Sequence, residues 1–244
     1  MIEVKNLSKS FGQSLIWQDV SFTIENNTVL AIIGRSGCGK SVLLKHLNAL
    51  LEPDKGEVLI NGENIYNLNY VKLRKVRQLF GVLFQGGALF DSINTFENVA
   101  FPLRYFSDKS ESEIKKRVLE CLDLVNLSNA GNKNTSDLSG GMRKRVGLAR
   151  AMVLEPRYLL YDEPTSGLDP ETSDEINDLI IDTAEKLNVT SVVITHDMHS
   201  VLKIADKAIF LDEQKLAWQG TIDEMKVSKN ERLLSFIKAA EYSI

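Results

Sequence analysis

An α/β fold with a mainly parallel sheet is predicted for this 244-residue chain from three features of the sequence. Apolar, β-branched runs recur along it, and several are followed by segments with helical periodicity. A glycine-rich loop separates one such run, residues 29–33, from the helical segment after it. From about residue 86 to residue 154, helical patterns replace the strands. Alternating strands and helices indicate parallel pairing, and we expect the helical block to be an insertion.

The spacing of apolar residues and the positions of turn residues predict the individual strands and helices. Alternation of apolar and polar residues predicts half-buried strands at 2–4 and 20–24, and Glu57 to Gly62 reads as a strand that enters an Asn-Gly turn. Short apolar runs predict buried strands at residues 80–84, 158–161, 191–194 and 207–211. Apolar residues at helical spacing predict helices at residues 42–51, 111–125 and 170–187, and an amphipathic helix in the tail after residue 220.

Composition and charge narrow the class of protein. A formal net charge of −4 argues against general nucleic-acid binding, which favours strongly basic faces. No apolar run approaches the roughly 18 residues of a membrane span, and the residues from Met1 to Lys5 lack the pattern of a signal peptide. Cys38 and Cys121 offer no disulfide framework, which indicates a reducing compartment. Cys38 is either a thiol with a lowered pKa beside a helix N-terminus or a small residue with no chemical role, and we favour the second reading.

The segment from Gly34 to Ser41 fits the G-x-x-x-x-G-K-[ST] pattern of a phosphate-binding loop. It lies between a predicted strand and a predicted helix, a context that disfavours the alternative of a simple glycine-rich turn. Its glycines let backbone N–H groups and the helix N-terminus face a phosphate. Lys40 is expected to reach the β- and γ-phosphates, and the Ser41 hydroxyl to ligate Mg²⁺. The predicted nucleotide-binding residues of the loop are Gly34, Ser36, Gly37, Cys38, Gly39, Lys40 and Ser41.

Two adjacent carboxylates, Asp162 and Glu163, follow the apolar run at 158–161 and precede Pro164. Ligands of α/β sheets bind at the C-terminal ends of the strands. Adjacent strand residues point to opposite faces, so we expect the two carboxylates to do different work. Asp162 suits the coordination shell of Mg²⁺, and Glu163, just beyond the strand, is expected to polarise an attacking water. A plain turn at the strand end is the alternative, which the upstream phosphate-binding loop disfavours.

A second anion site is predicted at Ser139, Gly140 and Gly141, where Ser139 is a good N-cap for the helical segment that follows. One chain then carries two phosphate-binding elements and one nucleotide loop. That pairing is explained if the second element meets the nucleotide of another molecule. The basic run Arg143 to Arg145 is expected to be a solvated helix face with one arginine tying two lobes together, a phosphate or lipid-headgroup site being the alternative.

The order of these motifs resembles that of the nucleotide-binding subunits of ABC transporters, and the resemblance covers essentially the whole chain. The motifs are the phosphate-binding loop, Gln85, the Leu-Ser-Gly-Gly run, the Asp-Glu pair, residues 166–169 and residues 195–197. The resemblance implies a RecA-like P-loop NTPase core with an antiparallel β lobe and an inserted α-helical subdomain. It implies a single ABC ATPase domain, with a nucleotide-binding core and β lobe at 1–85 and 155–220, a helical subdomain at 86–154 and a C-terminal helical tail at 221–244.

The resemblance also implies ATP and Mg²⁺ as ligands and a head-to-tail homodimer with two ATP molecules at the interface. The Ser139–Gly141 tip is then expected to bind the γ-phosphate in trans. Gln85 is expected to contact Mg²⁺ or the water, His196 the γ-phosphate, and Asp169 to couple the two sites. Phe11 is expected to stack on adenine, a buried aromatic residue at a strand end being the alternative.

Two stretches are similar to the ATPases of Mla/Mce-type lipid transporters. They are Leu83 to Phe90 and Leu138 to Val146, the second with Met142 where most ABC signatures carry glutamine. This implies transport of phospholipids or related lipids with an integral permease and a Mce-domain partner, from the cytoplasmic side of the inner membrane. The permease is expected to dock near residues 85–105, where apolar residues combine with expected exposure. Packing of the helical block is the alternative for that surface, and an amino-acid-type importer is the alternative function.

Overall fold

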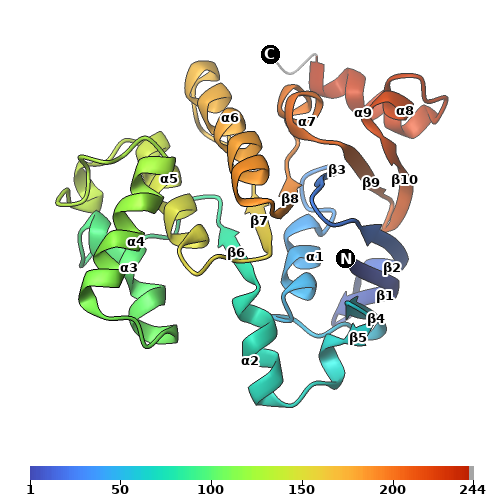
Figure 1. Cartoon of the computed structure of the whole chain (residues 1–244). Helices are drawn as coiled ribbons and strands as arrows, with labels where there is room; N and C mark the ends of the chain where they lie inside the picture. The colour runs from blue at the N-terminus through green and yellow to red at the C-terminus, as the bar shows by residue number, and fades with distance from the viewer. Residues whose placement is uncertain (242–244) are drawn as a thin grey trace. The chain divides into compact units, whose positions relative to one another are not determined.

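The structure, a computed structural model, describes residues 1–241, so residues 242–244 of the predicted tail lie outside the described residues (Figure 1). It divides into two compact units. The first contains residues 1–77 together with the chain from residue 190 onward, and the second contains residues 78–189. We call them the loop unit and the carboxylate unit, after the predicted motifs that they carry. The predicted boundaries of the helical subdomain stay a prediction.

The loop unit contains an antiparallel sheet in the order β2-β1-β4-β5. Its strands are β1 (Ile2–Phe11), β2 (Ser14–Ile24), β4 (Lys55–Ile60) and β5 (Glu63–Asn64). The predicted strands at 2–4 and 20–24 are present and longer, because β1 and β2 continue as a hairpin through Gly12, whose φ is +60°. The predicted Asn-Gly turn joins β4 to β5, with φ values of +52° at Asn61 and +85° at Gly62. The predicted antiparallel β lobe is therefore confirmed.

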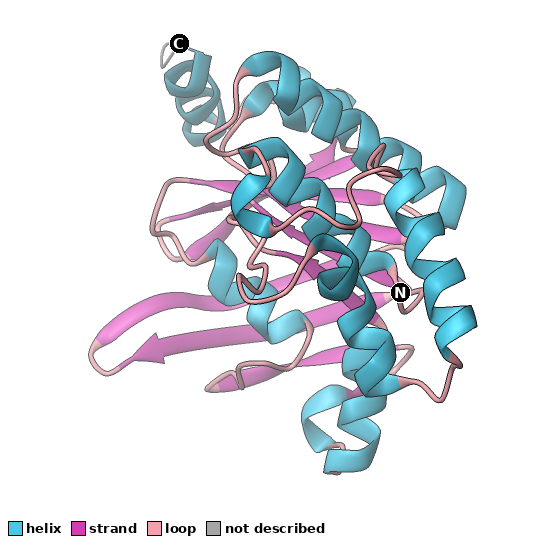
Figure 2. Ribbon diagram, turned by 90° about the vertical axis from the view of Figure 1, so that its left-hand side faces the viewer, coloured by secondary structure: helices cyan, strands magenta, loops and turns pink. Residues whose placement is uncertain are grey.

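The loop unit also contains strands in the order β10-β9-β3-β8. They are β3 (Val29–Gly34), β8 (Thr190–Ile194), β9 (Lys207–Asp212) and β10 (Lys215–Thr221). The central strand β3 pairs in parallel with both β8 and β9, and all of its residues are buried. Parallel strands buried on both faces read as continuous apolar runs, which is why the sequence pattern found these strands. Figure 2 shows the strands in magenta among the cyan helices.

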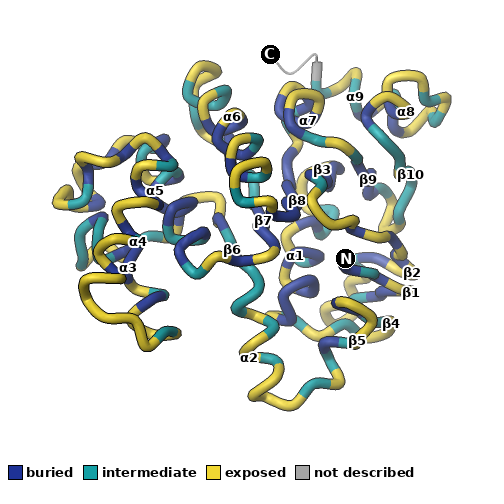
Figure 3. Tube along the Cα trace, viewed as in Figure 1, coloured by how far each residue is buried: buried dark blue, intermediate teal, exposed yellow. Residues whose placement is uncertain are grey.

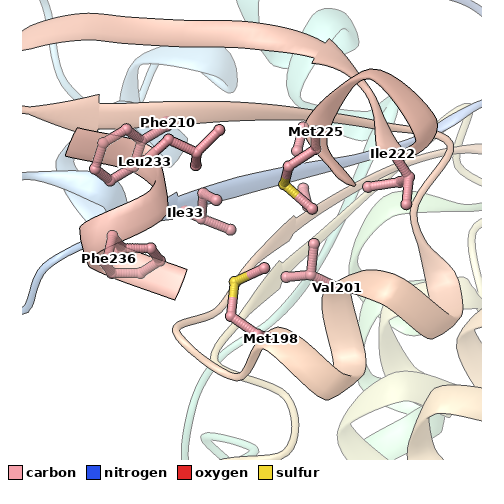
Figure 4. Packing of buried hydrophobic residues seen from close by; sticks show 10 residues of the cluster. Ile33, Met198, Val201, Phe210, Ile222, Met225, Leu233 and Phe236 are labelled. Atoms are coloured by element: carbon pink, nitrogen blue, oxygen red, sulfur yellow. The ribbon is translucent and has the colours of Figure 1, made fainter. Parts of the chain in front are cut away.

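Two short helices and the last helix of the loop unit pack together on strands β3, β9 and β10. The helices of this part of the chain are α1 (Lys40–Leu47), α2 (Tyr70–Gln78), α7 (Met198–Ile204), α8 (Ile222–Lys226) and α9 (Glu231–Glu241), with a 3₁₀ turn at Ile65–Asn67. Figure 4 shows one core cluster, in which Leu233 and Phe236 of α9 meet Phe210 of β9. The Phe210 and Phe236 ring centroids are 5.1 Å apart. The predicted amphipathic tail helix is therefore a packed element of the core.

The carboxylate unit contains one parallel strand pair and four α-helices among its described residues. The strands are β6 (Phe80–Leu83) and β7 (Tyr158–Asp162). The helices are α3 (Thr95–Phe106), α4 (Glu111–Leu124), α5 (Gly140–Met152) and α6 (Pro170–Leu187), with a 3₁₀ turn at Thr135–Asp137. Helix starts are set locally, since Ser110 and Glu113 form a capping box on α4 and Asp169 caps α6 ahead of Pro170. Figure 3 shows buried and exposed residues alternating along these helices, as the predicted amphipathic patterns require.

Two expectations about elements need correction. The helix predicted to reach residue 51 ends at Leu47, and Ala49 adopts a left-handed φ of +55°. Distant side chains stabilise this end, because the Arg77 guanidinium donates to the Ala49 carbonyl at 2.7 Å and the Tyr66 hydroxyl to that of His46 at 2.7 Å. Strand β10 was not predicted, since its apolar residues Leu216 to Trp218 are only partly buried and give a weak pattern. No helix among residues 1–241 has the length and apolarity that crossing a bilayer requires.

Candidate functional site

The phosphate-binding loop connects β3 to α1 in the loop unit. A Cβ atom at Gly34 would lie 2.5 Å from the Leu211 carbonyl oxygen, and one at Gly39 would lie 2.4 Å from Cγ2 of Ile16. Gly39 also has a φ of +93°, a conformation that side chains rarely adopt. These two glycines are therefore required both by the path of the backbone and by the elements packed on it.

Lys40 lies inside this loop with only 7% of its surface exposed. Its ammonium donates to the carbonyls of Gly34 at 2.7 Å and Arg35 at 3.1 Å, which are the residues at the start of the same loop. A fixed positive charge is thus held where the sequence predicts phosphate binding. Burial raises the pKa of the Cys38 thiol, and the nearby Lys40 lowers it less. A protonated thiol agrees with the reading of Cys38 as a small residue without its own chemistry.

A buried aromatic cluster lies behind the loop, and sequence reasoning missed it. The Trp17 indole nitrogen is 3.5 Å from the Gly39 carbonyl oxygen, and the Trp17 ring meets that of His46 edge-on at 5.1 Å. The Tyr66 hydroxyl is 3.4 Å from Nδ1 of His46. Burial lowers the pKa of His46 to about 4, so the ring is neutral at physiological pH. Trp17 and His46 carry no local signal in the sequence, because only the fold brings strand β2 against helix α1.

Phe11 and His196 are the other predicted nucleotide contacts in the loop unit. Phe11 is 48% exposed at the end of β1, which contradicts the alternative of a buried aromatic residue. It pairs with Ser14 across the hairpin, on the strand whose Ile16 packs at Gly39. His196 is exposed just after β8. The neighbouring Asp197 caps helix α7, accepting from the His199 N–H at 3.0 Å, so its role there is structural.

In the carboxylate unit, β7 ends at Asp162, and Glu163 follows with a left-handed φ of +49°. The expectation that Glu163 lies just beyond the strand is confirmed. The Ser166 N–H donates to the Glu163 carbonyl at 3.2 Å, which closes a turn. The Gln85 side-chain amide donates to the Ser166 hydroxyl at 3.2 Å. The structure thus brings Gln85 to the turn that carries Glu163. We call residues 163–166 the Glu163 turn.

The predicted anion site at Ser139–Gly141 forms the N-terminal tip of α5. Ser139 is exposed and its hydroxyl accepts from the Met142 N–H at 3.2 Å, the predicted N-cap bond. A Cβ atom at Gly141 would lie 2.5 Å from Cγ2 of Thr172, so this tip packs on the start of α6. Asp169 accepts from the Thr172 N–H at 2.9 Å and from the Thr172 hydroxyl at 2.7 Å, and these bonds lower its pKa. Asp169 is therefore the helix cap at that contact.

The basic run that follows the tip departs from the predicted solvated face at Lys144, whereas Arg143 is exposed as predicted. Lys144 is 5% exposed, and its ammonium donates to the Ser166 carbonyl at 2.6 Å and to the Glu163 carbonyl at 3.3 Å. Arg143 donates to the Leu138 carbonyl at 2.7 Å, and Arg145 forms an ion pair with Glu175. Burial lowers the pKa of Lys144 to about 8, while the Glu163 charge raises it less. These hydrogen bonds and this ion pair hold α5 in place within the carboxylate unit.

The predicted Mg²⁺ ligands are Ser41 in the loop unit and Gln85 and Asp162 in the carboxylate unit. They offer hydroxyl, amide and carboxylate oxygens, which are the donors that Mg²⁺ prefers alongside water and phosphate. Within residues 1–241, no group of at least three His, Cys, Asp or Glu side chains is arranged to hold a metal. The types of these donors suit a magnesium ion that also binds water and substrate phosphates.

A family model described as ABC transporter matches residues 17–166, from the middle of β2 to the end of the Glu163 turn. The chain belongs to the ABC transporter family. It is an ATP-binding subunit of such a transporter, an ATPase whose hydrolysis is coupled to transport.

Three curated relatives of this ABC ATPase carry different names. It is 44% identical to the probable ribonucleotide transport ATP-binding protein mkl of Mycobacterium leprae, over 97% of this chain and 68% of that protein. It is 41% identical to the intermembrane phospholipid transport system ATP-binding protein MlaF of Haemophilus influenzae, over 98% of this chain and 90% of that protein. It is 38% identical to the methionine import ATP-binding protein MetN of Clostridium tetani, over 99% of this chain and 76% of that protein. The chain spans about two thirds of the length of the mycobacterial relatives.

A solved structure gives the same family and fold. This ABC ATPase is similar to a dimeric post-hydrolysis state of the ATP-binding cassette MJ0796 bound to ADP and Pi, with a TM-score of 0.82 and 31% identity. The likeness covers 91% of this chain and 99% of that one. The predicted ABC ATPase fold is therefore confirmed, and ABC ATPases of this kind work as dimers with a membrane permease.

Proposed function

We propose that this ABC ATPase powers the transport of phospholipids or related lipids between membranes, through a separate integral permease at the cytoplasmic side of the inner membrane. The observation that carries this proposal is the 41% identity to MlaF, named for intermembrane phospholipid transport, over 90% of that protein. The Gly86-Gly87-Ala88 run after Gln85 and the Met142 variant of the signature add support from the sequence. A Mce-domain lipid-binding protein is part of the proposed assembly.

An amino-acid-type importer is the second candidate, because the methionine import protein MetN is 38% identical over 76% of its length. Another methionine import protein, MetN 3 of Shouchella clausii, is 41% identical over 71% of its length, the same identity as MlaF. In both readings the ATPase chemistry is the same, and only the permease and its cargo differ.

The proposed chemistry places each ATP between two copies that pack head to tail. Lys40 holds the β- and γ-phosphates, Phe11 stacks on the adenine, and the Ser139–Gly141 tip of the partner subunit caps the γ-phosphate. Glu163 acts as general base on the attacking water, and His196 contacts the γ-phosphate. Because the γ-phosphate is shared by both copies, hydrolysis removes the shared contact and the interface opens.

Three oxygen donors would hold Mg²⁺ in this scheme, namely Ser41, Gln85 and Asp162. The ion, when bound, neutralises charge on the phosphates. Gln85 has a second task in the proposal, because its amide also contacts Ser166 of the Glu163 turn. It therefore orients the turn as well as the phosphate side of the site.

The proposed permease-docking surface lies near residues 85–105 and carries exposed aromatic rings. Phe90 is 45% exposed, Phe101 42% and Tyr105 66%, and the centroids of the Phe90 and Phe101 rings are 4.9 Å apart. Exposed apolar patches on soluble domains mark protein or membrane contacts. The guanidinium of Arg150 in α5 donates to the carbonyls of Gly87 and Ala88, both at 2.8 Å. These bonds connect the start of this surface to helix α5.

A transport assay separates the two candidates. The chain is purified with the permease that co-purifies with it and is reconstituted in vesicles with ATP. ATP-dependent transfer of a fluorescent phospholipid to acceptor vesicles supports the lipid proposal. ATP-dependent uptake of methionine without lipid transfer rejects it in favour of the importer. The matched control is Glu163→Gln in the same complex, which should abolish either activity.

A further inference from the structure

We propose that Lys144 is a positioning residue for ATP hydrolysis: from helix α5 it holds the Glu163 turn and thereby orients the Glu163 carboxylate. The inference rests on the proposed role of Glu163 as general base and adds to it the residue that keeps that base in place. It is independent of the transported substrate.

The geometry of the turn supports this role. The Lys144 ammonium contacts the first and the last carbonyl of the turn, at 3.3 Å on Glu163 and 2.6 Å on Ser166. The Glu163 carbonyl also accepts the Ser166 N–H at 3.2 Å, so the turn-closing bond and the ammonium share one oxygen. Gln85 contacts the Ser166 hydroxyl at 3.2 Å and adds a third restraint.

The Glu163 backbone needs such a restraint. Its φ of +49° is a left-handed conformation, which is unfavourable for a residue other than glycine. Strained backbone of this kind persists where the surrounding structure holds it. The direction of the Glu163 side chain depends on that backbone conformation. Releasing the two carbonyls would therefore let the carboxylate leave the geometry required for proton abstraction.

The burial of Lys144 also calls for an explanation. An ammonium with 5% exposure loses most of its hydration, and hydrogen bonds to carbonyl oxygens compensate for that loss. An apolar side chain would be less costly to bury here if the position served packing alone. The retained charge is therefore best explained by the two carbonyls it holds.

The placement links the two parts of the proposed dimer site. Helix α5 begins at the Ser139–Gly141 tip, which in the proposed dimer caps the ATP held by the partner subunit, and Lys144 lies about one turn along the same helix. The Glu163 that it holds acts on the ATP of its own chain. Movement of the tip on capping would thus change the position of Glu163 through one side chain.

The test compares Lys144→Met, which has no donor, with Lys144→Gln, whose amide still donates, in the full chain. Lys116→Met, at an exposed lysine of α4, is the matched control. We expect Lys144→Met to lower kcat roughly 10–100-fold, as small misplacements of reacting groups do. The KM for ATP and the affinity for a fluorescent ATP should stay within about twofold, because Lys40 and the loop are unchanged. Lys144→Gln should recover part of kcat, and hydrogen exchange at the Ser166 amide should accelerate only in Lys144→Met.

Two outcomes in the Lys144 variants overturn the inference. Wild-type kcat in Lys144→Met rejects it, and so does a kcat in Lys144→Gln as low as in Lys144→Met with unchanged exchange at Ser166. If Lys144→Met fails to fold, Lys144→Gln against wild type decides by the same two readouts. Glu163→Gln is measured in parallel. Turnover that survives this change rejects the role of Glu163 together with that of Lys144, whereas a dead Glu163→Gln beside an active Lys144→Met rejects Lys144 alone.

Discussion

The phosphate-binding loop and the Glu163 turn are both short connections with a lysine amine on their carbonyls, yet they are held in different ways. Lys40 belongs to the loop itself and contacts Gly34 and Arg35, which are 6 and 5 residues away along the chain. Lys144 lies on helix α5 and contacts Glu163 and Ser166, which are 19 and 22 residues away along the chain. The first geometry arises within one contiguous motif, whereas the second exists only when α5 packs against the turn that follows β7.

This difference suggests a division of labour between the two units. The loop unit carries the parts expected to bind nucleotide, and its geometry is local. The carboxylate unit carries the parts expected to act on the terminal phosphate, and its geometry depends on tertiary packing. Substitutions in the first should therefore change affinity, and substitutions in the second should change turnover.

The largest effect is expected for Glu163→Gln. The change keeps the size and most of the hydrogen bonding of the side chain but removes the charge of the proposed base. We expect kcat to fall on the order of 10²–10⁴-fold while ATP is retained and a closed dimer accumulates. Phosphate release and size-exclusion chromatography with ATP measure both effects. Near wild-type turnover would falsify the assignment of Glu163.

Lowering the pH should destabilise the loop unit before the carboxylate unit. The pKa of buried His46 is lowered from 6.5 to about 4, so the unfolded chain binds the extra proton first as pH falls. Above pH 6.5 the neutral ring makes its full contribution to the free energy of unfolding. About 3 kcal/mol of that contribution is lost as the pH falls through about 4. Hydrogen exchange should show weaker protection of α1 before that of α5. In His46→Asn this acid dependence should be flatter, and an unchanged slope would contradict the role of His46.

Lys40→Ala should act on affinity. The change removes a charged donor that is expected to contact two phosphates, and such bonds contribute about 1.5–3 kcal/mol. We expect roughly 10–100-fold weaker binding in a fluorescent ATP titration. Arg35→Ala, which leaves the Arg35 backbone carbonyl in place, is a control within the same loop. Unchanged affinity in Lys40→Ala would show that the loop binds nucleotide without its lysine.

The smallest effect compares two helix caps of the carboxylate unit. Ser110→Ala and Ser139→Ala each remove one N-cap bond, on α4 and α5, and each should lower stability by about 1 kcal/mol in denaturant unfolding. Only Ser139→Ala should also reduce ATP-driven dimerisation, because only that serine belongs to the proposed trans site. Equal dimerisation of the two variants would reject the trans role of the tip.

Much of the fold follows from local signals. The buried strands β3, β8 and β9 read as apolar runs because both of their faces are covered. The starts of α5 and α6 follow from Ser139 and Asp169, whose side chains bond to N–H groups three residues on. The left-handed end of α1 at Ala49 had no such signal, since Arg77 and Tyr66 fix it from elsewhere in the chain.

By itself the sequence determined the phosphate-binding loop, the carboxylate pair, the tip of α5 and their order, because each is a contiguous pattern with its own local geometry. Only the tertiary structure decided that Lys144 is buried on the Glu163 turn, that Phe11 is exposed and that Trp17 and His46 back the loop. The physical reason is that burial depends on which distant elements pack around a residue. A basic run such as Arg143 to Arg145 has the same sequence pattern on a solvated face as against two carbonyls.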